Sequence, residues 1–215
     1  MGLTSDPAFL ATTFVVIDFE AATPAGFSPQ PIEVAALALR YGPDGWRRLG
    51  ASASLIKPPP FAPVTVDSAP RGLRPEHFAQ APGPAVVFGE LDRKFTDGTF
   101  LLVAQNASVE AGIIHNQAEY CPVLSRIDFL DTIPLAKQIM PGLASYGLDS
   151  LLAHYGIAMP ADRHRAAADV EVTAEVFVRL IRAADAIGRF SDLSALVRAA
   201  GRTSKCNMPV QDGLF

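Results

Sequence analysis

The chain has 215 residues, a length that favours one full-sized domain. Lys plus Arg is 18 and Asp plus Glu is 22, so the formal net charge is −4 with histidine neutral. This balance excludes a polybasic protein that holds nucleic acid by bulk charge alone. The 49% of hydrophobic and 19% of charged residues exclude an intrinsically disordered chain and predict a folded core.

The sequence indicates neither a membrane protein nor a secreted one. The apolar runs are interrupted by acids such as Asp18, so no membrane span is expected. The N-terminal segment has no basic region and carries Asp6 where a signal peptide needs an apolar run. The two cysteines, Cys121 and Cys206, cannot make a disulfide framework. We therefore expect a cytoplasmic protein with no membrane partner.

The predicted elements begin with three consecutive strands. Residues 13–19 form a β-branched and aromatic run that is typical of a buried strand. A second apolar run at 32–39 leads through a Gly-Pro-Asp-Gly turn to a third strand at 46–56, which predicts a hairpin. The proline-rich segment 57–84 is expected to be a surface excursion with a short helix near Glu76.

Helices and strands then alternate along the chain. The remaining predicted elements are helices at 85–95, 108–120, 135–140, 148–155, 165–186 and 191–200, and strands at 99–104 and 127–130. Ser108 is the expected N-cap of its helix, and a stripe from Val170 to Ile181 is expected to lie against the sheet. This order implies an α/β fold, a mixed sheet with helices on both faces. Residues 187–215 are expected to hold the last helix and a flexible tail.

Acidic residues stand at the predicted ends of several elements. Asp18 and Glu20 close the first strand, and Glu110 opens the helix after the fourth strand. His164 and Asp169 begin the long helix, so one helix start can aim both groups toward a common pocket. Carboxylates that share a small volume raise each other's pKa unless divalent cations compensate them. Their joint occurrence therefore indicates a metal site.

Each of these residues also has a simpler structural interpretation. Asp18 and Glu20 fit a solvated strand end. Asp169 is a favourable charge for the first turn of a helix, and His164 fits a surface residue within a basic run. These alternatives are open for each residue taken alone.

Three segments carry a family resemblance. They are 14–20 (Phe-Val-Val-Ile-Asp-Phe-Glu), 103–110 (Val-Ala-Gln-Asn-Ala-Ser-Val-Glu) and 164–169 (His-Arg-Ala-Ala-Ala-Asp). They resemble the three motifs of the DEDDh 3′-to-5′ exonucleases, the group that includes the proofreading subunits of bacterial DNA polymerase III. Shorter similarities lie at 26–29, 31–35, 71–73, 131–132 and 146–148. The resemblance implies an RNase H-like fold, a mixed five-stranded sheet flanked by helices on both faces, with an exonuclease domain at 10–186.

The resemblance also implies a set of site residues. Asp18, Glu20, Glu110 and Asp169 would hold two divalent cations, Mg²⁺ or Mn²⁺, since hard oxygen ligands suit these ions. His164 would remove the proton of the attacking water, because histidine ordinarily titrates near neutral pH. His164, Asp18, Glu20 and Asp169 would thus be the catalytic residues.

The implied substrate is a single-stranded DNA 3′ end, from which nucleoside 5′-monophosphates are released in proofreading or repair. Asn106 and the backbone near Ala21 and Ala22 would contact the terminal nucleotide. Arg163 and Arg165 either help to bind nucleic acid or are solvated charges. A DNA polymerase is an implied partner.

This sequence departs from the family pattern at several positions. The second motif usually has His, Phe and Asp where this chain has Gln105, Val109 and Glu110. After the first motif, Ala-Ala-Thr at 21–23 replaces Thr-Thr-Gly. Glu110 keeps the charge and adds a methylene, which leaves open whether the second metal is held by a shifted carboxylate, bound more weakly or lost.

Two other functions fit the same residues. One is an RNA-trimming 3′-to-5′ exoribonuclease, which would need a contact to the 2′-hydroxyl. The other is a catalytically weak module that binds nucleic acid or replication partners. The segment from Gln211 to Phe215, Gln-Asp-Gly-Leu-Phe, resembles the short peptides that bind the bacterial sliding clamp, and it also fits an ordinary apolar chain end.

Overall fold

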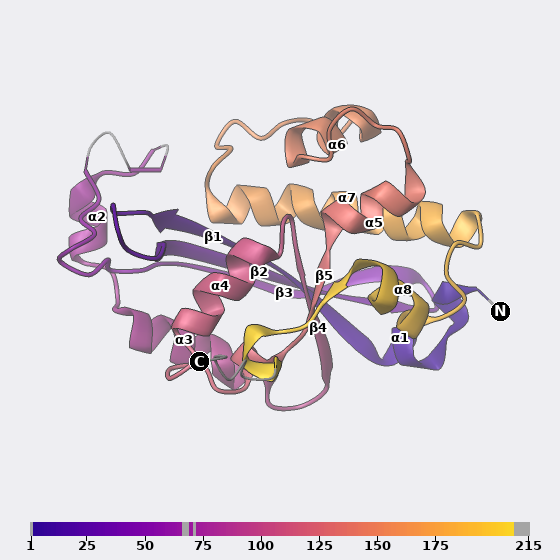
Figure 1. Cartoon of the computed structure of the whole chain (residues 1–215), viewed down its shortest axis with the longest axis horizontal. Helices are drawn as coiled ribbons and strands as arrows, with labels where there is room; N and C mark the ends of the chain where they lie inside the picture. The colour runs from indigo at the N-terminus through magenta and orange to yellow at the C-terminus, as the bar shows by residue number, and fades with distance from the viewer. Residues whose placement is uncertain (1, 66–68, 71, 209–215) are drawn as a thin grey trace, which may run out of the picture.

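A mixed sheet forms the centre of the protein (Figure 1). The computed structural model describes residues 2–65, 69–70 and 72–208. The six strands follow the order β3-β2-β1-β4-β5-β6. In chain order they are β1 Thr12–Ala22, β2 Gln30–Gly42, β3 Gly45–Leu55, β4 Thr99–Ala104, β5 Phe129–Asp131 and β6 Gly201–Arg202. The predicted mixed α/β fold is confirmed, with one more strand than the five expected.

The helices flank this sheet. They are α1 Pro7–Ala11, α2 Pro75–Ala79, α3 Pro84–Asp92, α4 Ser108–Asn116, α5 Thr132–Ile139, α6 Leu148–Tyr155, α7 Ala166–Ala186 and α8 Leu193–Ala200, with short 3-10 helices η1 Leu3–Ser5, η2 Arg93–Phe95, η3 Leu124–Arg126 and η4 Lys205–Asn207. The long helix expected at 165–186 is α7, and the short helix expected in the proline-rich segment is α2. Among the described residues, no helix has the length and apolar character needed to cross a lipid bilayer.

The first three strands form the predicted meander, since β1 pairs antiparallel with β2 and β2 with β3. Gly45, the first residue of β3 directly after the turn, has φ +94°, a conformation that glycine adopts without a steric penalty. Side chains of β1 alternate between the faces of the sheet. Phe14 and Val16 join one hydrophobic core, while Val15 and Ile17 join another. This strand is therefore buried on both faces, which explains its continuous apolar run.

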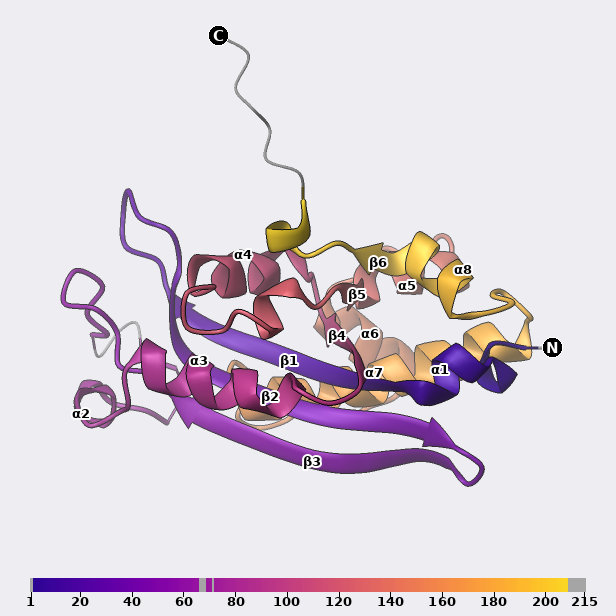
Figure 2. The ribbon, with the colours of Figure 1, turned by 90° about the horizontal axis from the view of Figure 1, so that it is seen from below.

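Helices cover both faces. The stripe on α7 that includes Val170, Phe177 and Ile181 packs into the core that contains Phe14, as expected. Helices α3 and α4 pack into the core that contains Val15. The two ribbon views place α7 and α3 on opposite faces of the sheet (Figure 1, Figure 2).

The direction of the strands determines where a site can form. β1 runs parallel to β4, and β4 runs parallel to β5. Their carboxyl ends therefore meet at one edge of the sheet, the edge at which open α/β sheets bind ligands. α4 begins four residues after β4 ends, and α5 follows β5 directly.

The first residues of the segment that was expected to be a flexible tail form a strand. Gly201–Arg202 pairs antiparallel with β5, and Leu196 and Ala200 of α8 are buried. The Ser204 backbone N–H donates to Asp128 at 2.8 Å. Backbone pairing needs no apolar pattern, so no side-chain pattern predicts β6. The domain boundary at residue 186 stays a prediction.

Candidate active site

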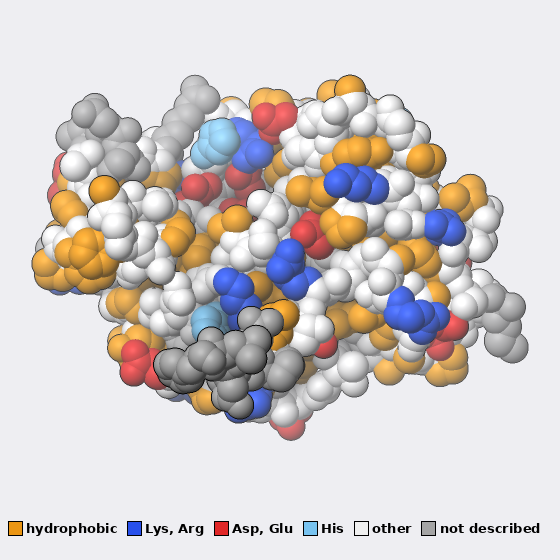
Figure 3. Space-filling model, in the orientation of Figure 1, with side chains coloured by type: hydrophobic (Ala, Val, Ile, Leu, Met, Phe, Trp, Pro, Cys, Tyr) orange, Lys and Arg blue, Asp and Glu red, His pale blue; other side chains and the backbone are white. Residues whose placement is uncertain are grey.

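Acidic side chains and an imidazole meet at the carboxyl end of β1. One ligand atom each from Glu20, His164 and Asp169 lies within 4.8 Å of the other two. Glu20 comes from β1, His164 from the loop before α7, and Asp169 from the first turn of that helix. Figure 3 shows acidic side chains in a hollow over the end of β1 and the start of α7.

The electrostatics link Asp18 and Glu110 to the same group. Burial, followed by the charge of Asp169, raises the pKa of Asp18 to about 7. Burial, followed by the charge of Asp18, raises the pKa of Glu20 to about 8. The same two causes raise the pKa of Glu110 well above its ordinary value. Burial also raises the pKa of Asp169. Asp18 is thus within electrostatic range of the other acids, and a cation here would neutralise charge that burial makes unfavourable.

Two buried carboxylate oxygens have no hydrogen-bond partner among the described residues, Glu110 Oε2 and Asp169 Oδ1. A buried polar atom without a partner is unfavourable, and more so when it carries charge. A divalent cation with oxygen ligands would coordinate such atoms and offset the repulsion between the acids. The residues present therefore fit a divalent metal site.

A tight turn between β4 and α4 places Glu110. Asn106 has φ +65°, and Asp131 accepts the backbone N–H groups of Asn106 and Ala107 at 3.2 and 3.0 Å. The Ser108 hydroxyl donates to the Asn106 side chain at 2.7 Å, and the N-cap of α4 is Ala107. The predicted N-cap role of Ser108 is wrong, because the left-handed turn moves the cap back by one residue.

Gln105, which stands where the family usually has histidine, connects this turn to two other segments. Its side-chain nitrogen donates to the Tyr146 carbonyl at 2.9 Å, and its side-chain oxygen accepts from the Thr132 hydroxyl. The similarities noted at 131–132 and 146–148 thus meet at the second motif. The roles of Gln105 and Asp131 in fixing this turn were not predicted from their sequence context.

The predicted substrate-binding residues flank the acids along the chain. Ala21 and Ala22 end β1 directly beyond Glu20, after a register shift in the pairing with β2. Asn106 lies in the turn that leads to Glu110. Their contacts with a nucleotide stay predictions.

The arginines on either side of His164 are engaged in ion pairs. Arg163 contacts Asp149 at 3.0 Å and also pairs with Asp169. Arg165 contacts Glu33 at 2.9 Å. Their side chains are 17% and 26% exposed, so neither is a freely solvated charge. Asp149 and Glu33 were not predicted as their partners, because these acids are distant from the arginines in the chain.

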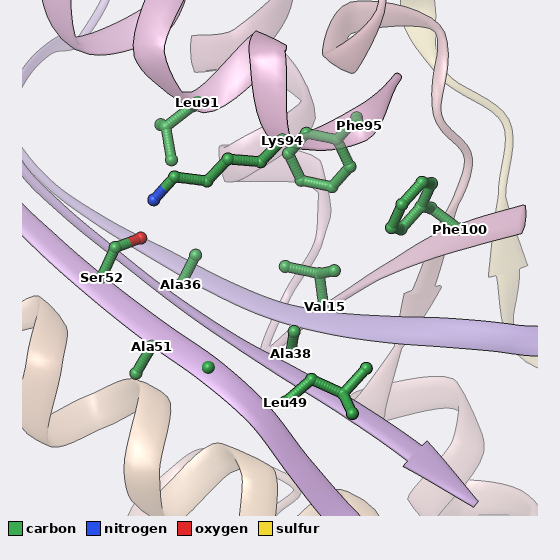
Figure 4. Close-up of a pocket in the computed structure, with 11 residues that line it drawn as sticks. Val15, Ala36, Ala38, Leu49, Ala51, Ser52, Leu91, Lys94, Phe95 and Phe100 are labelled. Atoms are coloured by element: carbon green, nitrogen blue, oxygen red, sulfur yellow. The ribbon is translucent and has the colours of Figure 1, made fainter. Parts of the chain in front are cut away.

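An apolar hollow lies elsewhere, between α3 and the meander (Figure 4). Val15, Leu49, Leu91 and Phe95 line a cavity of about 190 Å³, with Lys94 among the lining residues. No carboxylate lines it. The candidate chemistry therefore belongs to the acidic site.

Comparison with known families decides the assignment. The RNase T family model, described as an exonuclease, matches residues 15–177, a range that holds Asp18, Glu20, Glu110, His164 and Asp169. The chain belongs to this exonuclease family. The predicted family and enzyme class are confirmed, and the use of divalent metal ions is general in the DEDDh group.

A curated relative of this exonuclease is the DNA polymerase III subunit epsilon-like protein of Rhodobacter capsulatus. The two are 31% identical over 196 residues, which cover 88% of this chain and 27% of the relative. This exonuclease thus spans about a quarter of that protein's length, and less of the PolC-type polymerases that it also matches.

Solved structures support the fold. The nuclease domain of 3′hExo, a DEDDh family member bound to rAMP, has a TM-score of 0.66 at 15% identity, covering 84% of this chain and 96% of that one. Exonuclease X in complex with 5′ overhanging duplex DNA has a TM-score of 0.58 at 20% identity, covering 79% and 91%. At these identities the likeness confirms the predicted RNase H-like exonuclease fold.

Proposed function

We propose that this protein is a metal-dependent 3′-to-5′ exonuclease that releases nucleoside 5′-monophosphates from single-stranded DNA ends. The observation that carries the proposal is the approach of Glu20, His164 and Asp169 within 4.8 Å of one another. Asp18 and Glu110 interact electrostatically with that group. An exonuclease family model spans all five residues.

In this proposal, Asp18, Glu20, Glu110 and Asp169 bind two divalent cations, Mg²⁺ or Mn²⁺. The buried, unpartnered oxygens of Glu110 and Asp169 support this assignment. Bound divalent cations would neutralise the carboxylates, lower the pKa of a water molecule and stabilise charge on the scissile phosphate.

His164 acts as the general base for the attacking water. Its side chain is exposed and one of its ring nitrogens lies within 4.8 Å of carboxylate oxygens of Glu20 and Asp169, so it can reach a water at the substrate. Asn106 and the backbone of Ala21 and Ala22 orient the terminal nucleotide. Ala21 and Ala22 follow Glu20 in the chain, and Asn106 precedes Glu110 by four residues.

A labelled single-stranded oligonucleotide incubated with Mg²⁺ or Mn²⁺ tests the proposal. Release of mononucleotides from the 3′ end is expected, and Asp18→Asn or His164→Ala should abolish it while the far-ultraviolet circular dichroism is unchanged. Unchanged turnover in either variant would refute the mechanism. Release from the 5′ end would refute the direction.

An RNA 3′ end is the second candidate substrate. The solved neighbour bound to rAMP supports it, whereas the Exonuclease X neighbour is in complex with 5′ overhanging duplex DNA. Parallel assays on DNA and RNA of one sequence decide between them. If a contact to the 2′-hydroxyl exists, RNA will be cleaved faster than DNA.

We further propose a cytoplasmic role in replication or repair beside a DNA polymerase, supported by the polymerase III relatives. The segment from Gln211 to Phe215 is the proposed sliding-clamp peptide, and it lies outside the described residues. Deleting these five residues should abolish binding to the clamp and leave turnover on a short oligonucleotide unchanged. Clamp binding by the truncated chain would contradict this part of the proposal.

A further inference from the structure

His164 has a backbone conformation that its neighbours must maintain. Its φ is +68°, in the left-handed region that residues with a Cβ atom rarely adopt. Such a conformation persists when surrounding contacts determine it, and it recurs at functional sites. The two flanking residues, Arg163 and Arg165, both form ion pairs with residues of other elements.

On one side, Arg163 connects the loop before α7 to two helices. Its Nε donates to Asp149 of α6 at 3.0 Å, and its Nη1 pairs with Asp169 of α7. The backbone N–H of Arg163 also donates to Pro160 at 3.3 Å. The loop before α7 is therefore fixed to α6 and to a proposed metal ligand.

On the other side, Arg165 binds Glu33 of β2. Its Nε lies 3.1 and 3.0 Å from the two carboxylate oxygens, and its Nη2 lies 2.9 Å from one of them. The Ala166 backbone N–H also points at Glu33, at 3.4 Å. The Glu33 side chain is only 3% exposed, so this ion pair is shielded from water and holds the start of α7 against β2.

These contacts compete with a role in binding phosphate. Guanidinium groups that already donate to carboxylates, and that are 17% and 26% exposed, would have to break buried ion pairs to reach a nucleic-acid backbone. An arginine that binds phosphate is normally free to make that contact.

We propose that Arg163 and Arg165 are positioning residues that fix the left-handed His164 backbone, and with it the imidazole, beside the carboxylates. This inference rests on the proposed function, because it takes His164 as the general base. In this proposal, the two arginines of the Arg-His-Arg run hold the general base in place and do not bind the nucleic-acid backbone.

The test uses Arg163→Gln and Arg165→Gln in the full chain, with Arg179→Gln as the matched control. Arg179 lies on α7, distant from the loop that carries His164, and makes an exposed ion pair with Glu175. With oligonucleotide substrate, both test variants should lose about ten- to hundred-fold in kcat, because misplacing a base by about 1 Å has effects of that size. KM should stay within about twofold, and the salt dependence of binding should keep its slope.

A raised KM with a shallower salt slope would show that the arginines contact phosphate and would overturn the proposal. Unchanged kcat in both variants would also overturn it. Glu33→Gln should reproduce the effect of Arg165→Gln, and the double variant should be no worse than either single one, because the two side chains act as one unit. If a variant at the buried pair does not fold, Asp149→Asn replaces it in the test. The Asp149 side chain is 58% exposed, so this variant weakens the ion pair of Arg163 without disturbing the core.

Hydrogen exchange separates this inference from the proposed function. Backbone amides at 161–166 should exchange faster in Arg163→Gln and Arg165→Gln than in Arg179→Gln, without any substrate. Faster exchange in a protein that shows no turnover would support the positioning role while the proposed function failed. Unchanged exchange would contradict the positioning role whatever the turnover.

Discussion

Glu20 lies directly opposite Glu33 in the antiparallel register of β1 and β2. Residues in such a pair point to the same face of a sheet, so two acids are neighbours on one face. Arg165 neutralises Glu33, whereas Glu20 has no ion pair among the described residues and its pKa is raised to about 8. In this strand pair, Glu33 is therefore held in an ion pair, and the neighbouring Glu20 is available to bind a cation.

The raised pKa values predict how stability depends on pH. Asp18 and Glu20 have pKa values of about 7 and 8 in the folded chain, against 3.8 and 4.5 for the isolated groups. The folded protein therefore binds more protons than the unfolded chain between about pH 4 and 8, so its stability falls as pH rises through that window. In EDTA we expect a loss of roughly 2 kcal/mol between pH 5 and 8.5, mainly from Asp18, because solvent screens the more exposed Glu20.

Urea unfolding at a series of pH values measures this loss. Saturating Mg²⁺ should remove most of the fall, since a bound cation stabilises the ionised acids. The Asp18→Asn, Glu20→Gln double variant should have a flatter profile in EDTA. Stability that rises between pH 5 and 8.5 in the wild-type protein would contradict the assigned pKa directions.

Replacing Glu110 with Gln should raise the stability of the protein and lower its activity. It is 3% exposed, and one of its oxygens has no partner. Glu110→Gln removes the free-energy cost of keeping a buried carboxyl group ionised or of protonating it, so in EDTA at pH 8 we expect the free energy of unfolding to increase by about 1 to 3 kcal/mol. The same variant should lose about 100-fold or more in metal-dependent turnover, because a metal ligand is gone.

Glu110→Asp is the matched variant that keeps the charge and restores the residue usual in the family. It should retain metal-dependent turnover and bind Mn²⁺, measured by electron paramagnetic resonance, at least as tightly as the wild-type chain. Loss of turnover in Glu110→Asp together with full activity in Glu110→Gln would remove Glu110 from the proposed metal site.

The site acids were predictable because their signals are local in the sequence. The apolar run that ends in Asp18 identifies a strand, and the spacing from His164 to Asp169 fits the start of a helix. Burial of β1 on both faces follows from its unbroken apolar pattern. The parallel direction of β1 and β4 then brings the strand ends together.

The supporting contacts were not predictable from local patterns. Glu33 and Arg165 are separated by 132 positions, and Gln105 and Tyr146 by 41. Nothing in a single sequence pairs one acid with one arginine over such a distance, because the pairing depends on the register of the folded strands. From the sequence alone, the arginines beside His164 were therefore consistent with solvated charges and with charges that bind nucleic acid. Only the folded structure shows the ion pairs that they form.

Asp131 offers a last prediction, because it fixes the second motif without belonging to it. Its carboxylate accepts the backbone N–H groups of Asn106, Ala107 and Ile133 at 3.2, 3.0 and 2.9 Å, and its residue is 7% exposed. Asp131→Ala leaves these donors without a partner, and we expect a loss of about 3 kcal/mol in the free energy of unfolding, measured with urea.

Asp192 provides the control, since its carboxylate caps α8 by accepting the backbone N–H of Ala195 at 2.8 Å. Asp192→Ala should cost about 1 kcal/mol, the usual value for an N-cap. Asp131→Ala should also weaken Mn²⁺ binding, because the turn that carries Asn106 sets the direction of the first turn of α4 and of Glu110. Equal losses of stability in both variants, with Mn²⁺ binding unchanged, would mean that Asp131 acts only as a cap of α5.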